Sequence, residues 1–116
     1  MYGLIVRWSL QQAPAEVAQQ LRDYVTRTSL ARFTGLPGLS FKVWRMQEGA
    51  WFEGTYVFAT AAERKEFAAA FSLQAPSAPV TVMIGSEPIA VETCEVVAVA
   101  EGGAGVTAGA GPGSDG

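Results

Sequence analysis

The sequence has no histidine and only one cysteine, Cys94. Without histidine the chain lacks the commonest general base and the commonest metal ligand, and serine–histidine or cysteine–histidine nucleophile pairs are excluded. A single cysteine forms no disulfide within the chain, which is typical of proteins from a reducing compartment. Neither a G-x-G-x-x-G pattern nor a P-loop is present. We therefore expect no metal and no cofactor, and any chemistry must depend on Tyr, Arg, Lys, Glu and Trp side chains and the backbone.

Charged residues are also scarce, at 16% of the chain with a net charge of −3, and they form no basic run. Nucleic acid is therefore not an expected partner. The N-terminal stretch "MYGLIVRWSLQQ" has Arg7 inside a short apolar run, which favours a first strand over a signal peptide or a membrane span. The sequence thus predicts a cytoplasmic protein without a membrane partner.

The chain is instead rich in apolar residues, which make up 49% of its 116 residues. Such a length predicts a single domain, and a small domain with surplus apolar surface often covers it in a dimer interface or a ligand pocket. We assign residues 1–100 to this domain. Residues 101–116 are rich in Gly and Ala and lack large side chains, so we expect a disordered tail.

Periodicity predicts the order of the secondary structure elements. Apolar residues alternate over 2–10, as in a strand, whereas Val17, Leu21, Tyr24 and Val25 recur with helical spacing. Thr60 and Glu63 have the spacing of a capping box at the start of a helix. In chain order, the expected elements are a strand over 2–10, a helix from Pro14 to 33, strands over 39–46 and 51–59, a helix over 60–71, a short strand or docking segment over 80–85, and a last strand over 88–100.

The order β-α-β-β-α-β is that of the ferredoxin-like α+β fold with an antiparallel sheet. The two helices would cover one face of the sheet, and we expect a second copy of the chain to cover the other. The segment "QEGA" predicts a tight hairpin between the two central strands. A two- or four-residue loop without a bulge gives the following pairs: Met46 with Trp51, Trp44 with Glu53 and Lys42 with Thr55 on one face, and Arg45 with Phe52, Val43 with Gly54 and Phe41 with Tyr56 on the other.

Glu53 is the first candidate for a functional residue. In one interpretation it forms a cross-strand charge pair with Lys42 beside Trp44 at a dimer interface. In the other, the apolar wall of Trp44 and Trp51 raises the pKa of Glu53, which then serves as a general acid or base. Both interpretations bury the same residues, so the sequence leaves the choice open.

Tyr56 and two arginines are the other polar candidates. Tyr56 is either a core tyrosine or a hydrogen-bond donor to a substrate phenol or enolate. Arg45 and Arg7 lie inside apolar strands, where a buried arginine needs a partner; each therefore reaches solvent at the strand end or binds an anionic ligand. Phe41 and Phe52 are expected on the Tyr56 face as substrate-binding residues.

The stretches "PGLSFKVWRM" and "FEGTYVFATAAERKEF" resemble the YdhR-like mono-oxygenase family of the dimeric α+β barrel superfamily. That family carries Pro-Gly, then K-V-W, then Gly-x-Tyr-x-Phe running into a helix. The order of elements is similar over residues 3–100, and the residue matches concentrate between 37 and 71. The sequence departs from the family at "APVTVMIG", in place of a helical segment, and at Glu53, where a small residue is usual. The matching residues are Pro37, Gly38, Lys42, Val43, Trp44, Gly54, Tyr56 and Phe58.

The resemblance implies a homodimeric barrel and a cofactor-independent mono-oxygenase. Its substrate would be a hydrophobic aromatic or polyketide-type intermediate of natural-product biosynthesis, deprotonated to an enolate or phenolate that reacts with O2. Glu53 would be the base, Tyr56, Arg45 and Arg7 would stabilise the anion, and Trp44 would be a stacking wall with Lys42 beside it. A non-oxidative cyclase or isomerase would use the same residues, and a non-catalytic dimer that binds a small ligand is the third possibility.

Overall fold

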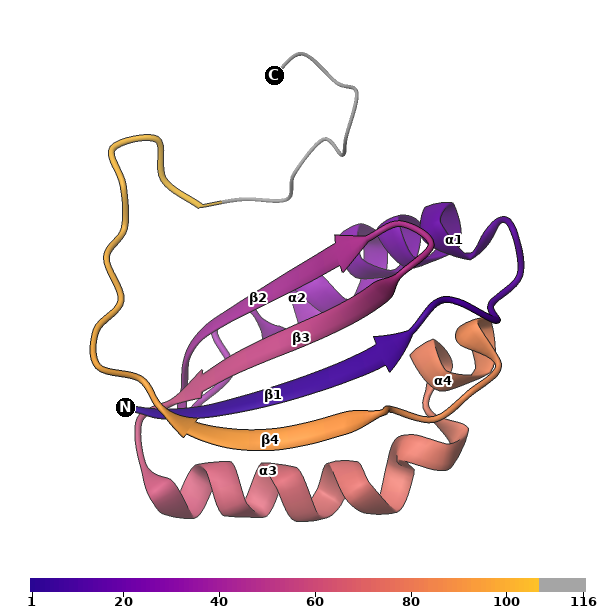
Figure 1. The fold of residues 1–116 in the computed structure, drawn as a ribbon. Coiled ribbons are helices and arrows are strands. Elements are labelled where there is room, and N and C mark those ends of the chain that lie inside the picture. Colours follow the sequence, from indigo (N-terminus) through magenta and orange to yellow (C-terminus); the bar gives the residue numbers. More distant parts are fainter. Residues whose placement is uncertain (107–116) are drawn as a thin grey trace.

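The computed structural model describes residues 1–106, which form an α+β structure around one four-stranded antiparallel sheet (Figure 1). The strand order is β2-β3-β1-β4. This order agrees with the expected ferredoxin-like arrangement, in which each βαβ unit is split by a strand between its two members. The elements are β1 (Tyr2–Ser9), α1 (Val17–Tyr24), a π-helical segment (Val25–Ser29), α2 (Leu30–Phe33), β2 (Leu39–Gln47), β3 (Trp51–Phe58), α3 (Ala61–Gln74), a 3-10 turn (Ala75–Ser77), α4 (Pro79–Ile84) and β4 (Ala90–Glu95).

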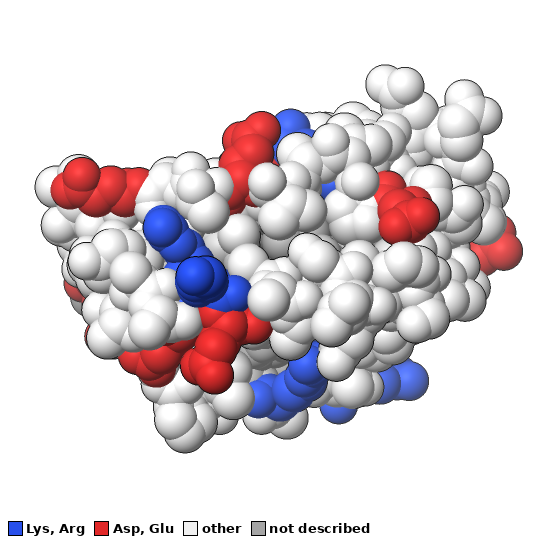
Figure 2. Space-filling view, turned by 90° about the horizontal axis from the view of Figure 1, so that it is seen from below, with Lys and Arg blue, Asp and Glu red and all other residues white. Residues whose placement is uncertain are grey.

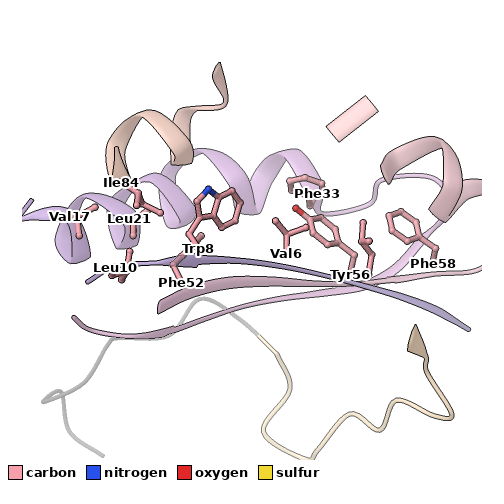
Figure 3. Packing of buried hydrophobic residues seen from close by; sticks show 11 residues of the cluster. Val6, Trp8, Leu10, Val17, Leu21, Phe33, Phe52, Tyr56, Phe58 and Ile84 are labelled. Carbon is pink, nitrogen blue, oxygen red and sulfur yellow. The ribbon is translucent and has the colours of Figure 1, made fainter. Parts of the chain in front are cut away.

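The core lies between the sheet and the helices, which gather on one face of the sheet (Figure 3). The alternation predicted for β1 is confirmed, because Leu4, Val6 and Trp8 are buried on the helix face. Leu21 of α1 packs against them, as its helical spacing predicted. Within residues 1–106 no helix lies over the other sheet face, below the strands in Figure 3. We call it the open face.

The first helix begins and continues differently from the expectation. It starts at Val17 rather than at Pro14, because residues 14–16 form a turn in which the Val17 N–H donates to the Pro14 carbonyl at 3.1 Å. It then runs through the π-helical segment into α2 and ends at Phe33. A π-helical insertion widens one turn of a helix and frequently lies at a functional site. Here it faces the groove described below.

The segment over 80–85, expected to be a short strand or a docking segment, lies in a helix, α4, which ends at Ile84. Pro79 occupies its first turn, where a missing N–H costs nothing, and Gly85 ends it at a φ of 86°. The indole N–H of Trp8 donates to the Thr81 hydroxyl at 3.1 Å, which fixes α4 on the sheet. The last strand is shorter than expected: β4 ends at Glu95, and residues 96–106 form neither helix nor strand. The remainder of the predicted disordered tail, 107–116, lies outside the described residues.

The expected register of the β2–β3 hairpin is wrong by one residue. Gln47 pairs with Trp51, which leaves a three-residue loop that contains Gly49 at a φ of 80°. Three-residue hairpin loops of this kind place a glycine in the left-handed region, and an odd loop length shifts one strand against the other by one residue. There is also a bulge between Leu39 and Phe41. The observed pairs include Met46 with Phe52, Arg45 with Glu53, Trp44 with Gly54, Val43 with Thr55, Lys42 with Tyr56 and Phe41 with Val57.

The predicted start of α3 is confirmed, since the Thr60 hydroxyl accepts from the Glu63 N–H at 3.2 Å. Phe67 and Phe71 stack one turn apart, with ring centroids 6.3 Å apart. The charged residues of α3 all lie within 63–66. Figure 2 accordingly shows a charged group toward one end of this side of the molecule and broad uncharged surface beyond it. One helical run, Ala61–Ile84, is apolar and long enough to cross a membrane by length and composition alone, and core helices of soluble proteins meet the same criteria.

Candidate functional site

The structure divides the predicted site residues between the two faces of the sheet. Because of the corrected register, Arg7, Arg45 and Glu53 share the open face, whereas Lys42, Trp44, Phe52 and Tyr56 lie on the helix face. Phe41 pairs with Val57 on the open face. The expected single site that combined Glu53 with Trp44 and Lys42 is therefore wrong, as is the expected neighbourhood of Arg45 and Phe41 with Tyr56. Two separate polar groups take its place.

The first group, the Glu53 cluster, consists of Glu53 with Arg7, Arg45, Thr55 and Trp51 on the open face. Arg7 Nε and Nη2 lie 2.9 and 2.7 Å from Glu53 Oε2. Arg45 binds the other oxygen, Oε1, through Nε at 3.1 Å and also through Nη2. Both guanidinium groups lie over the Trp51 ring, with Cζ 4.3 and 5.1 Å from its centroid. Arg7 and Arg45 therefore both have the partner that an arginine in an apolar strand needs, because each forms an ion pair with the Glu53 carboxylate.

This pairing determines the ionisation of Glu53. Burial alone would raise the pKa of its carboxyl, but hydrogen bonds from Arg45, Arg7 and Thr55 together with the Arg45 charge outweigh it and lower the pKa. Glu53 is only 2% exposed and remains a carboxylate at neutral pH. A general base needs a pKa near the working pH, so the predicted role of Glu53 as a base with a raised pKa is corrected. The charge-pair interpretation is closer, although arginines and Trp51 replace Lys42 and Trp44.

The second group, the Lys42 cage, is formed by three aromatic rings around the amine of Lys42 on the helix face. Lys42 Nζ lies 3.5 Å from the ring centroid of Phe33, 4.1 Å from that of Tyr56 and 4.4 Å from that of Trp44. Nζ donates to the Tyr56 hydroxyl at 3.0 Å. Phe67 of α3 packs against the Tyr56 ring at a centroid distance of 4.7 Å and holds it in place. In Figure 3 the Tyr56 hydroxyl points toward Phe33.

The cage changes the ionisation of both polar groups in it. Burial, followed by the positive charge of Arg32, lowers the pKa of Lys42 to about 6. Burial also raises the pKa of Tyr56, which therefore keeps its proton. Aromatic faces attract a cation, but within residues 1–106 no carboxylate forms an ion pair with Lys42. At neutral pH the cage accordingly holds an uncharged amine next to a protonated phenol.

The cage opens into a groove of about 870 Å³ that runs along β2, which we call the β2 groove. The first helix bounds it on the helix face, and Val43, Arg45, Gly105 and Val106 bound it beyond the edge of β2. This volume is in the range of small-molecule sites, which are mostly apolar with a few polar groups. Lys42 and Trp44 lie on its sheet side, and Phe33 lies on its helix side. Five of the predicted site residues border it: Phe41, Lys42, Trp44, Arg45 and Phe52. Arg7, Glu53 and Tyr56 do not line it. Further apolar lining comes from Leu21, Val25, Leu30, Leu39 and Met46.

Sequence reasoning missed the contribution of the first helix to this site. Phe33 supplies one wall of the cage, and the Cζ atom of Arg32 lies 5.0 Å from the Phe33 ring centroid, where its charge acts on Lys42. Neither residue was among the candidates identified from the sequence. The only local signal was the position of both residues at the end of the helix, directly before the "TGLPG" stop that returns the chain to β2. Within residues 1–106 no cluster of Cys, Asp and Glu side chains could hold a metal ion.

The sequence matches no protein-family model and no curated protein. The resemblance to the YdhR-like mono-oxygenases therefore remains a prediction that rests on the motif residues. The function has to be argued from the geometry of the β2 groove and its cage.

Proposed function

We propose that this protein is a cofactor-independent enzyme that binds a hydrophobic aromatic or polyketide-type molecule in the β2 groove and converts it to an enolate or phenolate. The observation that carries the proposal is the position of Lys42 Nζ, which is enclosed by three aromatic rings and 3.0 Å from the Tyr56 hydroxyl. A lysine desolvated in an apolar pocket and close to another cation is an activated base or nucleophile. Lys42 thereby replaces Glu53 as the base.

The proposed reaction begins when the Lys42 amine takes a proton from an acidic C–H or O–H group of the substrate. Its pKa of about 6 leaves it mostly unprotonated at neutral pH, and an amine with a pKa near the working pH is an effective general base. The protonated Tyr56 hydroxyl can donate a hydrogen bond to the oxygen on which negative charge develops. Trp44 offers an aromatic face on which a planar substrate stacks.

The anion then has two fates. In the mono-oxygenase version it passes an electron to O2, and the recombined peroxide loses water, so that a CH2 group and O2 become a carbonyl group and H2O. In the non-oxidative version the same anion cyclises or rearranges without O2. The resemblance favours oxidation, and the groove accommodates either reaction.

The open face supports a second part of the proposal, that the chain pairs with another copy of itself. Ile5, Val43 and Phe41 form apolar surface there that no helix of residues 1–106 covers. Apolar surface left open on a small domain favours association. Light scattering on the purified chain would give the mass of a dimer if this is correct and that of a monomer if it is not.

The reaction is tested by incubating the protein with a reduced aromatic polyketide, such as an anthrone, with and without air. We expect oxygen uptake and a product that has gained one oxygen atom and lost two hydrogens. The activity should be lost in Lys42→Met and reduced in Tyr56→Phe. Lys65→Met is the matched control, because Lys65 is exposed on α3 and is the only other lysine.

Each other outcome identifies a different function. Conversion without oxygen uptake, at unchanged mass or with loss of water, would identify a cyclase or isomerase. Full activity in Lys42→Met would remove Lys42 as the base. Saturable binding of the anthrone without conversion would identify a non-catalytic binding protein.

A further inference from the structure

We propose that the Lys42 amine forms a Schiff base with the carbonyl group of an apolar aldehyde or ketone bound in the β2 groove. The Lys42 cage and the neighbouring Tyr56 hydroxyl supply the three features that this covalent chemistry needs. These are a nucleophilic nitrogen with a free lone pair, a proton donor within hydrogen-bond distance, and space for the carbonyl compound. The inference uses the same groove as the proposed function, but it does not depend on the deprotonation step.

The nitrogen is available as a nucleophile because, among residues 1–106, no carboxylate pairs with it and holds it as an ammonium ion. Its hydrogen-bond partner, 3.0 Å away, is the neutral hydroxyl of Tyr56. The remaining neighbours are the faces of Phe33, Trp44 and Tyr56, which offer no acceptor stronger than a π-face. Burial and the Arg32 charge keep the amine unprotonated at neutral pH. Schiff-base lysines in enzymes are activated by this combination of desolvation and a nearby cation.

The groups around the amine that titrate or carry charge come from three elements. Arg32 of α2 lowers the pKa of Lys42, and Tyr56 of β3 bonds to it directly. Burial is the main cause that raises the pKa of Tyr56; the Arg32 charge lowers it, and Tyr24 of α1 raises it by a smaller amount. From α3, the side chain that packs against Tyr56 is Phe67, which carries no charge. None of these groups carries a negative charge that would stabilise the ammonium ion. The amine therefore remains a nucleophile across the neutral range.

Tyr56 supplies the acid for the dehydration step. The Nζ lone pair attacks the carbonyl carbon, a C–N bond forms as the C=O π bond breaks, and a proton moves from the nitrogen to the carbonyl oxygen to give a carbinolamine. The hydroxyl group then leaves as water with a proton from Tyr56, the C=N bond forms, and Tyr56 recovers its proton from the nitrogen. The sum is R–NH2 plus O=CR2 giving R–N=CR2 plus H2O, with no oxidation or reduction.

The β2 groove provides the space and selects the carbonyl compound. Its volume of about 870 Å³ exceeds that of a single ring system. Leu30 and Leu39 line it, together with Phe33 and Trp44. Such walls favour flat, apolar carbonyl compounds over charged or sugar-like ones. The chemical class of the ligand is therefore an aromatic or conjugated aldehyde or ketone.

The chain allows an unusually direct test, because its only lysines are Lys42 and Lys65. The intact protein would be incubated at pH 7 with 2-naphthaldehyde and sodium cyanoborohydride, which reduces an imine to a stable secondary amine. Peptide mapping by mass spectrometry then gives the labelling rate of each lysine. We expect Lys42 to react about tenfold faster than Lys65, since its large unprotonated fraction outweighs the weaker nucleophilicity of a less basic amine.

The pH dependence and two variants sharpen this result. Labelling of Lys42 should rise with pH through about 6 and then level off, because the amine is fully unprotonated above its pKa. Lys65→Arg should leave the labelling of Lys42 unchanged. Tyr56→Phe should slow it several-fold while the circular dichroism spectrum stays the same, which a purely structural tyrosine would not do. Equal rates at the two lysines, or labelling of Lys42 only at high pH, would overturn the inference.

The choice of aldehyde separates this inference from the proposed function. 2-Naphthaldehyde has no hydrogen on the carbon next to its carbonyl, so it reports imine formation and cannot be deprotonated there. Solvent deuterium exchange into a 2-tetralone, measured without the reductant and at catalytic protein concentration, reports deprotonation. Exchange without labelling of Lys42 would disprove the Schiff base and support Lys42 as a general base. Labelling without exchange would disprove the general base and support the Schiff base.

Discussion

Each face of the β2–β3 hairpin buries one ionisable side chain, and the two side chains differ in whether they keep their charge. On the open face, Glu53 lies against Trp51 but both of its oxygens are bound by arginines, and its pKa is lowered so that it keeps its charge. On the helix face, Lys42 lies against Phe33 and Trp44 with one neutral hydroxyl as partner, and its lowered pKa makes it lose its charge. The same direction of pKa change therefore preserves one charge and removes the other.

This difference separates the structural and the chemical roles of the two groups. A buried ion that is fully paired is stabilised in place, and removing one partner leaves an uncompensated charge. A buried amine without an opposite charge gives up its proton instead, and the resulting lone pair is available for reaction. We therefore expect the Glu53 cluster to hold the central strands β1, β2 and β3 together, and the Lys42 cage to carry the chemistry.

The largest expected effect follows from breaking the Glu53 cluster. In Glu53→Gln the guanidinium groups of Arg7 and Arg45 would be left close together without a carboxylate. We expect the free energy of unfolding to fall by about 3 kcal/mol, the lower end for loss of one partner from a buried ion pair, because both arginines keep some contact with water. Urea unfolding followed by circular dichroism measures this value.

The matched control for this prediction is an ion pair on the surface. Arg22 and Glu48 are 2.8 Å apart, and the Glu48 side chain is 62% exposed. Exposed pairs contribute at most about 1 kcal/mol, so Glu48→Gln should change the unfolding free energy little. If the two variants were equally stable, Glu53 would not hold the strands together, and its pairing with the arginines would only keep its carboxyl group ionised.

The next largest effect is the pH dependence of stability that Lys42 introduces. Below about pH 6 both the folded and the unfolded chain carry the proton, and the folded chain bears the full cost of burying the ammonium. Between about pH 6 and the ordinary lysine pKa of about 10.5, the folded chain has lost this proton but the unfolded chain keeps it. The unfolded state then binds more protons, and the free energy of unfolding rises with pH.

Lys42→Met isolates this contribution, because all other titrating groups are common to both proteins. The difference in unfolding free energy between wild type and variant should shift by about 2 kcal/mol in favour of wild type from pH 6 to pH 8, close to the value for one proton released over two pH units. Urea unfolding at pH 6, 7 and 8 measures it. A difference that stays constant with pH would show that the Lys42 amine is charged in the folded chain.

Much of the fold could be predicted from the sequence because its signals are local. The alternation in β1, the Thr60–Glu63 capping box and the helical spacing of Val17 and Leu21 all correspond to contacts within one element or with the nearest layer. The segment over 80–85 was expected to be a short strand or a docking segment because its β-branched residues favour a strand. Pro79, Gly85 and the Trp8–Thr81 hydrogen bond make it a helix instead. Tertiary contacts prevailed over local preference there.

The site was less predictable, because it depends on one hairpin loop. Gly49 in the left-handed region closes a three-residue loop, and this single residue decides that Glu53 faces Arg45 instead of Trp44. The right residue types were identified, but the expected register put Glu53 on the face of Trp44 and Lys42, and Arg45 on the face of Tyr56. Arg32 and Phe33 could not have been placed beside Lys42 from sequence, since their approach depends on how the first helix crosses the sheet and on its π-helical segment.

The smallest expected effect tests what keeps the Lys42 amine uncharged. Burial is the larger cause of its low pKa and the Arg32 charge is the smaller one, so Arg32→Gln should raise the pKa of Lys42 above about 6 and leave it far below 10.5. The pH midpoint of Lys42 labelling by 2-naphthaldehyde measures this pKa, and Arg27→Gln, an exposed change on the neighbouring π-helical segment, serves as the control. A midpoint that returned to the ordinary lysine range would mean that charge repulsion, not the aromatic enclosure, makes Lys42 reactive. A midpoint that stayed in place would mean that burial in the cage alone keeps the Lys42 amine uncharged. The contrast with the charged Glu53 would then depend entirely on which face of β2 and β3 offers an opposite charge.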